Sequence, residues 1–473
     1  MSTTHTDVMI LGGGPVGLTL ACLLNSMGVS NTVVERDAEP YSLPRAIVMD
    51  DEILRAMHDL GVGDWLTANT QVLERADFVG PDGNVVTGMD IPPAGLQGVP
   101  PVVVHYQPEL DAMLRRRAEG TGSRTLWGQT IKDMRDLGDR VETVLDDGET
   151  VTSRWFVGCD GASSWTRRHV GLTLEDLRFD QEWLVVDIEL NDGATVELPL
   201  GVRQYCRTER PCTYVKGVRR FRRWEFQVQP HEDSAQLNTE SGLWGLLSEW
   251  VTPADARLVR SAVYRFHAVV APAMQKGNVF LAGDSAHQTP PFAGQGLNSG
   301  MRDALNLAWK LAFVSRGVMN PKILDTYTPE RAPHVRSTIA HAVDMGRLID
   351  QLAGRESHGV GVDSGYGGKR PAPSLESGWL VPGDDRVGHQ FWYRPEVSRA
   401  VTTNGACVAV VSEQPIGLPE SLASMGAVNV VAQGATGGSY AVVVRPDRYV
   451  AAVADSAEGL SAVGHSLAGY SRG

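Results

Sequence analysis

The stretch that decides the fold is DVMILGGGPVG, residues 7–17. An apolar, strand-like run leads straight into three glycines, and residues 18–28, LTLACLLNSMG, continue with a helical pattern. A second strand-like run covers residues 31–35 and ends in Glu35. A strand, a Gly-x-Gly-x-x-Gly turn, a helix and an acidic residue about 20 positions further on predict a dinucleotide-binding βαβ unit.

Each glycine of this turn has its own mechanical role. Gly12 allows the tight turn, Gly14 allows the backbone to approach a diphosphate, and Gly17 allows the helix to pack against the strand. The helix then begins with free N–H groups aimed at negative charge. Glu35 is placed to accept hydrogen bonds from an adenosine ribose. The alternative is a glycine-rich turn in a plain α/β core, which the strand and helix context disfavours; the turn alone does not separate NAD from FAD.

A second segment favours a flavin. Residues 277–284 have the pattern of a turn, a buried strand and an acid at its carboxyl end, where open α/β sheets bind ligands. Asp284 is therefore a candidate to hold the ribityl chain of a flavin. Residues 290–298, PPFAGQGLN, then bring bare backbone to the start of a helix. Its N–H groups and positive dipole end suit the pyrimidine edge of an isoalloxazine, which Gly294 and Gly296 allow to approach closely.

Bulk composition indicates small-molecule chemistry. The chain has 473 residues, 42% of them hydrophobic, which is enough for two or three structural units. A formal net charge of -13 argues against nucleic acid or anionic membranes as partners. The five cysteines form no CxxC pair and no zinc-like spacing, so we expect a reducing compartment and no metal site. The chain has no basic leader and no apolar run near the roughly 18 to 20 residues that span a bilayer, so we expect a cytoplasmic protein.

Three motifs in order give the sequence a family resemblance. After the glycine turn come a DG motif at Asp160-Gly161 and a GD motif at Gly283-Asp284. The sequence resembles the group A FAD-dependent aromatic hydroxylases of the para-hydroxybenzoate hydroxylase type, and within them most closely the 3-(3-hydroxyphenyl)propionate hydroxylase-like branch. The resemblance implies tightly bound FAD. It also implies that NADH or NADPH binds transiently in a groove, and no second dinucleotide turn with strand and helix context is found.

The resemblance also implies cofactor contacts residue by residue. Arg45, in Leu43-Pro44-Arg45-Ala46, matches a family arginine near the flavin and the diphosphate, and Gln107 matches a glutamine that contacts the cofactor. Asp160 of the DG motif supports FAD and the nicotinamide cofactor. Taken alone, Arg45 and Gln107 would be read as solvated loop residues, and Asp160 as part of a strand-end turn. The full set of predicted FAD-contacting residues is Gly12, Gly14, Pro15, Val16, Gly17, Glu35, Arg36, Arg45, Gln107, Asp160, Asp284, Pro291, Gly294, Gly296, Leu297 and Asn298.

The expected fold is α/β with an inserted sheet. A Rossmann-like FAD-binding domain takes residues 1–175 and 266–353, and an antiparallel β-sheet domain for the substrate takes residues 176–265. Within the insert, residues 222–228, RRWEFQV, alternate between polar and apolar side chains. This alternation predicts a sheet with two unlike faces, which is suited to roof the flavin.

A composition shift marks the end of the catalytic part. Residues 354–376 are rich in Gly, Pro and Ser and are interpreted as a linker. Residues 377–473 resemble the thioredoxin-like carboxyl-terminal domain of larger family members but lack CxxC. Since thiol chemistry is therefore not expected there, we expect this domain to support packing or a homodimer.

The implied function is hydroxylation of an aromatic substrate, in the first instance a phenol. The family uses NAD(P)H and molecular oxygen and acts through a flavin C4a-hydroperoxide. A phenol must be oriented, and preferably deprotonated, before oxygen is transferred to its ring. Tyr205, Tyr214 and His267 are the polar-tipped catalytic candidates, although His267 also fits a hydrogen-bonded structural histidine.

Two alternatives remain open. One is a hydroxylase for a larger polyketide or antibiotic, which pocket volume would distinguish. The other belongs to a different class, a flavin-binding redox-sensing protein, for which no aromatic compound would accelerate NAD(P)H oxidation. The exact substrate, the choice between NADH and NADPH and the oligomeric state do not follow from the sequence.

Overall fold

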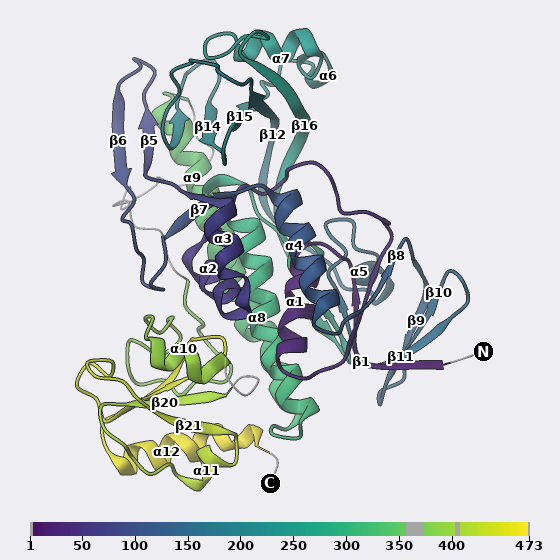
Figure 1. Ribbon diagram of the computed structural model, residues 1–473, viewed down its shortest axis with the longest axis vertical. Coiled ribbons are helices and arrows are strands. Elements are labelled where there is room, and N and C mark those ends of the chain that lie inside the picture. The colour runs from purple at the N-terminus through teal and green to yellow at the C-terminus, as the bar shows by residue number, and fades with distance from the viewer. Residues whose placement is uncertain (1–2, 356–372, 403–406, 472–473) are drawn as a thin grey trace.

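The computed structural model describes residues 3–355, 373–402 and 407–471, which form two large sheets, the helices between them and a smaller carboxyl-terminal unit (Figure 1). In the first sheet β1 is central, with β2 and β8 on one side and β11 and β18 on the other. These strands pair in parallel, as crossover connections require. The strands of this sheet are β17 (Gln275–Lys276), β18 (Val279–Leu281), β11 (Thr150–Gly158), β1 (Thr3–Leu11), β2 (Asn31–Glu35), β8 (Arg124–Trp127), β10 (Val141–Leu145) and β9 (Ile131–Asp136).

The register of the first sheet brings the predicted cofactor motifs to one edge. Leu11 pairs with Val34 and with Gly158, and Gly158 pairs with Leu281. The glycine turn and Glu35 follow the first two positions directly, and the DG and GD motifs begin two residues after Gly158 and Leu281. Segments that are far apart in the sequence therefore meet at the carboxyl ends of the parallel strands, where open sheets of this kind bind ligands.

Long helices cover this sheet. The first is α1 (Pro15–Ser26), which packs against both α4 (Gln107–Gly120) and α8 (Gln295–Ser315), and α8 in turn packs against α9 (Tyr327–Leu352) (Figure 1). Nearly the whole of α8 is buried, which suits a helix held between the first sheet and the carboxyl-terminal unit. The shorter helices and turns of the first two domains are α2 (Asp51–Met57), η1 (His58–Val62), α3 (Gly63–Asn69), α5 (Trp165–His169), η2 (Gly283–Ser285), η3 (Phe292–Gly294) and η4 (Pro321–Thr326).

The second sheet lies at the top of Figure 1 and is built around its two longest strands, β12 and β16. Its pairs are antiparallel except for β13 with β5, which is parallel. In order the strands are β19 (His287–Gln288), β16 (Ala256–Val270), β12 (Glu175–Leu190), β15 (Phe221–Gln227), β14 (Cys212–Lys216), β13 (Val202–Tyr205), β5 (Arg75–Val79) and β6 (Val85–Asp90), and α6 (Ser234–Leu237) and α7 (Glu240–Leu247) cover one face. A small separate sheet has the order β3 (Val48–Asp50), β7 (Val102–His105) and β4 (Thr70–Val72).

The second sheet does not keep to the bounds predicted for the inserted domain, residues 176–265. β5 and β6 come from the chain before that range, β19 comes from the chain after it, and β16 continues beyond residue 265. A strand pattern shows that a segment is extended, but its partner strand depends on contacts that are distant in sequence. The pairing of β19 with β16 also joins the GD loop directly to the substrate-side sheet.

The carboxyl-terminal unit is a mixed four-stranded sheet with helices. Its strands run in the order β21 (Ala427–Val431), β20 (Val408–Ser412), β22 (Ala441–Val444) and β23 (Val450–Ala454), and its helices are α10 (Pro395–Thr402), α11 (Glu420–Ala423), α12 (Ala457–Leu467) and η5 (Ala468–Tyr470). Residues 356–372 of the predicted linker lie outside the described residues. One continuous hydrophobic cluster runs from α8 into this unit, with the rings of Trp309 and Trp379 5.8 Å apart.

Buried charges strengthen that contact. Arg445 lies 2.7 Å from Glu330 and 2.7 Å from Asp447, and Lys310 of α8 also lies 2.7 Å from Glu330. Burial alone would raise the pKa of the Glu330 carboxyl, but Arg445 and Lys310 outweigh burial and hold that pKa well below its usual range. The carboxyl-terminal unit therefore packs on α8 and α9 as an integral part of the fold. Among the described residues, no helix is long and apolar enough to cross a bilayer.

Candidate active site

The glycine turn has the shape that a bound diphosphate needs. Gly12 has a φ of 113°, and its N–H donates to the carbonyl oxygen of Val34 at 2.8 Å. A Cβ at Gly17 would lie 2.1 Å from the carbonyl oxygen of Gly12, so only glycine lets α1 approach the turn. A Cβ at Gly14 would meet no other described atom within 4 Å. Open space therefore lies beside the first turn of α1, whose N–H groups are free to bind an anion.

Glu35 lies at the end of β2, beside this turn. Its Oε2 accepts a hydrogen bond from the N–H of Gly13 at 2.7 Å, and its Oε1 accepts one from the N–H of Asp37 at 3.0 Å. These bonds orient the carboxylate at the turn, as its predicted role requires. The side chain of Arg36 is 79% exposed and lies 3.8 Å from Asp37, so its guanidinium is held in solvent.

The GD turn meets the glycine turn directly. Gly283 in η2 has a φ of 66°. A Cβ at Gly283 would lie 3.0 Å from Cγ2 of Val16, and a Cβ at Gly300 of α8 would lie 2.6 Å from the same atom. The starts of α1 and α8 and the GD turn thus converge on Val16. This is the arrangement that one cofactor needs when it is bound by both predicted segments.

Asp284 is the accessible residue of an otherwise buried turn. Its neighbours Gly283 and Ser285 are buried, whereas the Asp284 side chain is exposed. The surrounding protein still desolvates this carboxyl and raises its pKa, against the opposing effects of His287 and Arg45. A carboxylate that a ligand can reach, but that water hydrates poorly, is suited to accept hydrogen bonds from the hydroxyls of a ribityl chain.

Asp303 of α8 fixes the GD turn from beneath. Its Oδ2 accepts the N–H of Gly283 at 2.9 Å and lies 2.7 Å from Nε2 of His287, while its Oδ1 accepts Nε of Arg331 at 2.7 Å. Burial would raise the pKa of Asp303, but His287 and Arg331 outweigh burial and lower it. The sequence analysis did not select Asp303. The sequence shows only an acidic residue within a helical stretch, which by itself does not indicate a contact with the GD turn.

The loop that leads into α8 exposes backbone. Gly294 has a φ of 63°, and a Cβ there would lie 2.9 Å from Cβ of Val48. A Cβ at Gly296 would meet no other described atom within 4 Å. Pro291 in this loop and Leu297 in the first turn of α8 are partly exposed. The segment therefore keeps free space and N–H groups at the helix start, which agrees with its predicted place beside a flat ring.

Two of the predicted cofactor side chains bond to the protein backbone instead. Asn298 is fully buried, donates to the carbonyl oxygen of Gly294 at 2.7 Å and accepts the N–H of Asp50 at 3.1 Å. Gln107 is buried, and its Oε1 accepts the N–H of Ala46 at 2.6 Å. Both side chains hold the loops of the site in place.

Asp160 of the DG motif organises its own loop. Its carboxylate accepts Oγ of Ser164 at 2.6 Å, together with the N–H of Thr166 at 2.9 Å and the Oγ1 of Thr166 at 3.0 Å. Asp160 remains partly exposed at the strand edge. These contacts fit the structural half of its predicted role.

The Arg45 loop joins the first domain to the second sheet. Arg45 is exposed, and its guanidinium carbon lies 4.7 Å from the centre of the Tyr41 ring. The carbonyl oxygen of Arg45 accepts a hydrogen bond from Nη1 of Arg223 at 2.6 Å. The positive charge of the Arg45 side chain opposes the rise in the pKa of Asp284. The β15 face that bears Arg223 is therefore the face turned towards the GD turn.

The predicted catalytic side chains are not brought together there. Tyr205 and Tyr214 point to the opposite face of the sheet, into the hydrophobic cluster beneath α7. The Tyr205 ring lies 5.5 Å from that of Trp250, and burial raises the pKa of Tyr214 to about 12. His267 is exposed on β16, where it pairs with Asp180 of β12. These positions differ from the prediction because alternation shows that a sheet has two faces, but not which face a helix covers.

The face of the second sheet that bears Arg223, called the inner face below, carries a group of charged residues that the sequence analysis did not assign to the site. Arg223 binds Asp187 through two hydrogen bonds of 2.7 Å and 2.9 Å. Arg260 lies 3.7 Å from Asp187, and Glu225 lies 3.9 Å from Arg223. The alternation in residues 222–228 contains this signal, because Arg223 and Glu225 alternate with Trp224 and Phe226.

Aromatic rings lie on the same face, nearer the GD loop. Trp183 lies 5.4 Å from Phe292 and 6.1 Å from Phe266, measured between ring centres. Phe292 belongs to the loop before α8, whereas Trp183 and Phe266 come from β12 and β16. An apolar wall and a charged group thus stand side by side on the inner face, which suits the binding of an aromatic ring with a polar substituent.

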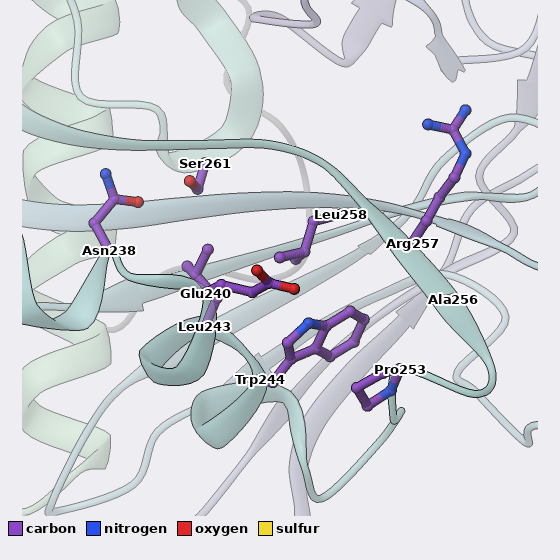
Figure 2. A pocket seen from close by; sticks show the side chains of 9 residues that line it. All are labelled: Asn238, Glu240, Leu243, Trp244, Pro253, Ala256, Arg257, Leu258 and Ser261. Carbon is purple, nitrogen blue, oxygen red and sulfur yellow. The ribbon is translucent and has the colours of Figure 1, made fainter.

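A cavity of about 590 Å³ opens on the other side of this sheet, between α6, α7 and β16 (Figure 2). In Figure 2 the Trp244 ring and the Leu258 side chain border it, with Arg257 at its edge. None of the predicted cofactor or catalytic residues lines it. The lining residues are Asn238, Glu240, Leu243, Trp244, Pro253, Ala256, Arg257, Leu258 and Ser261.

The comparison with known families identifies the class of protein. Residues 5–342 match the model of the FAD binding domain family, and the chain belongs to this family. The residues present fit that cofactor: Gly14 leaves room beside a helix start, and Asp284 offers a reachable carboxylate. The prediction of FAD as cofactor is confirmed.

Curated relatives are about one third identical. The chain is 36% identical over 348 residues to a probable NADH-specific resorcinol 4-hydroxylase of Rhodococcus jostii (strain RHA1), covering 72% of this chain and 65% of that protein. It is 36% identical over 349 residues to a 3-(3-hydroxy-phenyl)propionate/3-hydroxycinnamic acid hydroxylase of Mycobacterium sp. (strain JLS), covering 73% of this chain and 61% of that protein. The matched part thus spans less than two thirds of these relatives.

Solved structures share the fold. An aklavinone-11 hydroxylase in a ternary complex with FAD and aklavinone aligns with a TM-score of 0.82 at 21% identity, covering 99% of this chain and 100% of that chain. The flavin-dependent monooxygenase PieE, in complex with FAD and substrate, aligns with a TM-score of 0.80 at 21% identity, covering 98% and 99%. The predicted fold class is confirmed by these matches.

Proposed function

We propose that the protein is a FAD-dependent monooxygenase that hydroxylates a phenolic compound with NADH or NADPH and molecular oxygen. One observation carries the proposal: the two cofactor turns converge on Val16, next to a sheet face that combines aromatic rings with charged side chains. The hydroxylase names of both relatives support it, and the Rhodococcus relative is described as NADH-specific, which favours NADH.

Each part of the site has a task in this reaction. The start of α1 would bind the diphosphate, Asp284 would accept hydrogen bonds from the ribityl chain, and the start of α8 would face the ring. When bound there, FAD would supply the redox chemistry, namely hydride acceptance from the nicotinamide and activation of oxygen. The apolar wall around Trp183 and Phe292 would exclude water and orient the substrate ring.

The proposal is tested with the purified full chain. Resorcinol, 3-(3-hydroxyphenyl)propionate and larger polycyclic phenols are added singly, and NADH and NADPH oxidation is followed together with the mass of the product. We expect at least one phenol to accelerate NADH oxidation and to gain one oxygen atom. If the protein binds FAD but no phenol accelerates oxidation or gains oxygen, the redox-sensing alternative replaces the proposal.

The cofactor assignment of Asp284 has its own test. Asp284→Ala is expected to fold normally but to purify with little bound FAD, since the ribityl hydroxyls lose their acceptor. Asp325→Ala, at an exposed position of η4, serves as the matched control. FAD occupancy is measured by absorbance after gel filtration. Full occupancy in Asp284→Ala would show that Asp284 is not needed to bind FAD.

A further inference from the structure

Glu225 occupies a central place on the inner face of the second sheet. It lies in β15, opposite Val185 of β12 and Thr213 of β14. Along its own strand, Arg223 and Gln227 flank it on the same face. Glu225 is therefore surrounded by other strands on both sides and is 9% exposed.

The neighbours of Glu225 are already paired with other groups. Arg223 gives two hydrogen bonds to Asp187 and a third to the Arg45 carbonyl oxygen. Gln227 accepts a hydrogen bond from Arg355, and Thr213 donates to Gln204. Glu225 itself makes no hydrogen bond to another described residue, and its one ion-pair distance, to Nη1 of Arg223, is 3.9 Å.

A nearly buried carboxyl without a hydrogen-bond partner is costly to the fold, and such groups are concentrated where a ligand uses them. Burial raises the pKa of Glu225 to about 7, with Arg223 opposing and Asp187 adding to the shift. A group with this pKa can accept a proton near neutrality and still release it again.

Positive charge lies next to Glu225. The charged or titratable groups around it are Arg223 and Asp187, with Arg260 and His105 beyond them. Burial first, and Arg223 second, lower the pKa of His105 to about 3, so this histidine is neutral at physiological pH. The Arg223 guanidinium therefore lies close enough to stabilise a phenolate oxygen beside Glu225.

Contacts connect the surroundings of Glu225 to the GD turn. Arg223 reaches the Arg45 carbonyl oxygen, and the Arg45 charge acts on Asp284. A ring held against Trp183 and Phe292 would lie on the same face as Glu225, one edge towards the flavin and the other towards the charged group.

We propose that Glu225 is the catalytic residue that takes the hydroxyl proton of the bound phenol. This inference rests on the proposed function and names a residue for it. In the step, the O–H bond of the phenol breaks and an O–H bond forms on the Glu225 carboxylate. The step transfers a proton and changes no oxidation state. Its products are a phenolate beside Arg223 and a neutral Glu225 carboxylic acid. Glu225 returns the proton to water when the hydroxylated product leaves.

The test compares Glu225→Gln with the wild-type holoenzyme, using resorcinol and 3-(3-hydroxyphenyl)propionate as probes. Ultraviolet difference spectra on binding report whether the phenol ionises. In the wild type we expect a phenolate signal, and kcat/KM that rises with pH through about 7. In Glu225→Gln we expect that signal and that pH limb to disappear and kcat/KM to fall about 100-fold, with FAD content unchanged and a melting temperature no lower than that of the wild type.

Two further variants complete the design. Glu225→Asp keeps a carboxylate and is expected to recover part of the phenolate signal. Glu249→Gln, on the other side of the sheet with a side chain 53% exposed, is the control and should behave as wild type.

The inference and the proposed function can fail separately. Hydroxylation by a wild-type enzyme whose bound phenol stays neutral, or a phenolate signal and pH limb that survive in Glu225→Gln, overturns the role of Glu225 alone. Phenol ionisation without hydroxylation supports Glu225 and overturns the proposed function. Binding of neither probe by the wild type overturns the role of Glu225 in this substrate class.

Discussion

His287 and Asp303 are joined by a contact of 2.7 Å between Nε2 and Oδ2, with side chains that are 1% and 0% exposed. The histidine belongs to the GD loop and the aspartate to α8, so this pair attaches the loop to the helix. The same carboxylate binds the N–H of Gly283 and Nε of Arg331. One buried carboxylate thus fixes the turn that carries Asp284.

Removing the Asp303 charge should weaken both stability and FAD binding. Asp303→Asn leaves Arg331 buried without its counter-ion, which costs about 3 to 5 kcal/mol. We expect the free energy of unfolding to fall by that amount in denaturant titrations and FAD to dissociate more readily. Asp325→Asn is the exposed control. An Asp303→Asn protein with wild-type stability would contradict the anchoring role.

The same residue predicts a pH dependence. The pKa of Asp303 is lowered in the folded state, so its stabilising contribution is present above the unfolded pKa of about 4 and is lost as pH falls through the folded value. We expect the wild type to lose stability below about pH 4 more steeply than Asp303→Asn, as measured by melting temperature against pH. Parallel curves for the two proteins would argue against this contribution.

The glycine turn offers a matched pair of alanine substitutions. Gly17→Ala places a Cβ 2.1 Å from a backbone oxygen, so we expect loss of folded protein. Gly14→Ala meets no other described atom within 4 Å, so the protein should fold but lose affinity for FAD, because the new methyl group occupies the space of the diphosphate. Circular dichroism and bound-flavin absorbance separate the two effects. Tight FAD binding by Gly14→Ala would place the diphosphate elsewhere.

Arg445 should be essential for the packing of the carboxyl-terminal unit. Arg445→Ala leaves Glu330 and Asp447 buried with a reduced counter-charge, and we expect a loss of about 3 to 5 kcal/mol in the free energy of unfolding. Arg399→Ala, at an exposed position of α10, is the control and should cost less than about 0.5 kcal/mol. Calorimetry of Arg445→Ala could instead show two transitions, with the carboxyl-terminal unit unfolding before the rest of the protein. That result would contradict the conclusion that this unit is an integral part of the fold.

Tyr214 should be dispensable for catalysis. Its hydroxyl is buried and has no hydrogen-bond partner among the described residues, and Arg222 approaches it without a bond of normal geometry. We expect Tyr214→Phe to retain kcat/KM within about twofold and to be as stable as wild type or more stable by about 1 kcal/mol. Steady-state kinetics and denaturant titration measure both. A loss of about 100-fold in kcat would return Tyr214 to the active site.

Local patterns predicted the backbone of the two cofactor turns. The turn at Gly12 to Gly17 and the strand before Asp284 each need a particular backbone shape, and a backbone shape leaves a local signature of glycines between a strand and a helix. Asp303 and Arg331 leave no such signature, because their pairing depends on the contact between α8 and α9.

The substrate side shows the opposite case. The alternation at residues 222–228 predicts two unlike faces of β15, but it does not show which of the two faces a helix covers. Only the position of α7 decides that Tyr214 is covered, whereas Glu225 lies on the opposite face of the sheet.

The sequence by itself determined the glycine turn, the strand before Asp284 and the α/β class, because φ preferences and strand–helix periodicity act between near neighbours. The tertiary structure alone decided which sheet β5, β6 and β19 join, and which face of that sheet is turned towards the GD turn. The physical reason is that side-chain alternation is the same whichever face is buried, and the choice is made by the hydrophobic surface of α7 and the buried charges that close the other side.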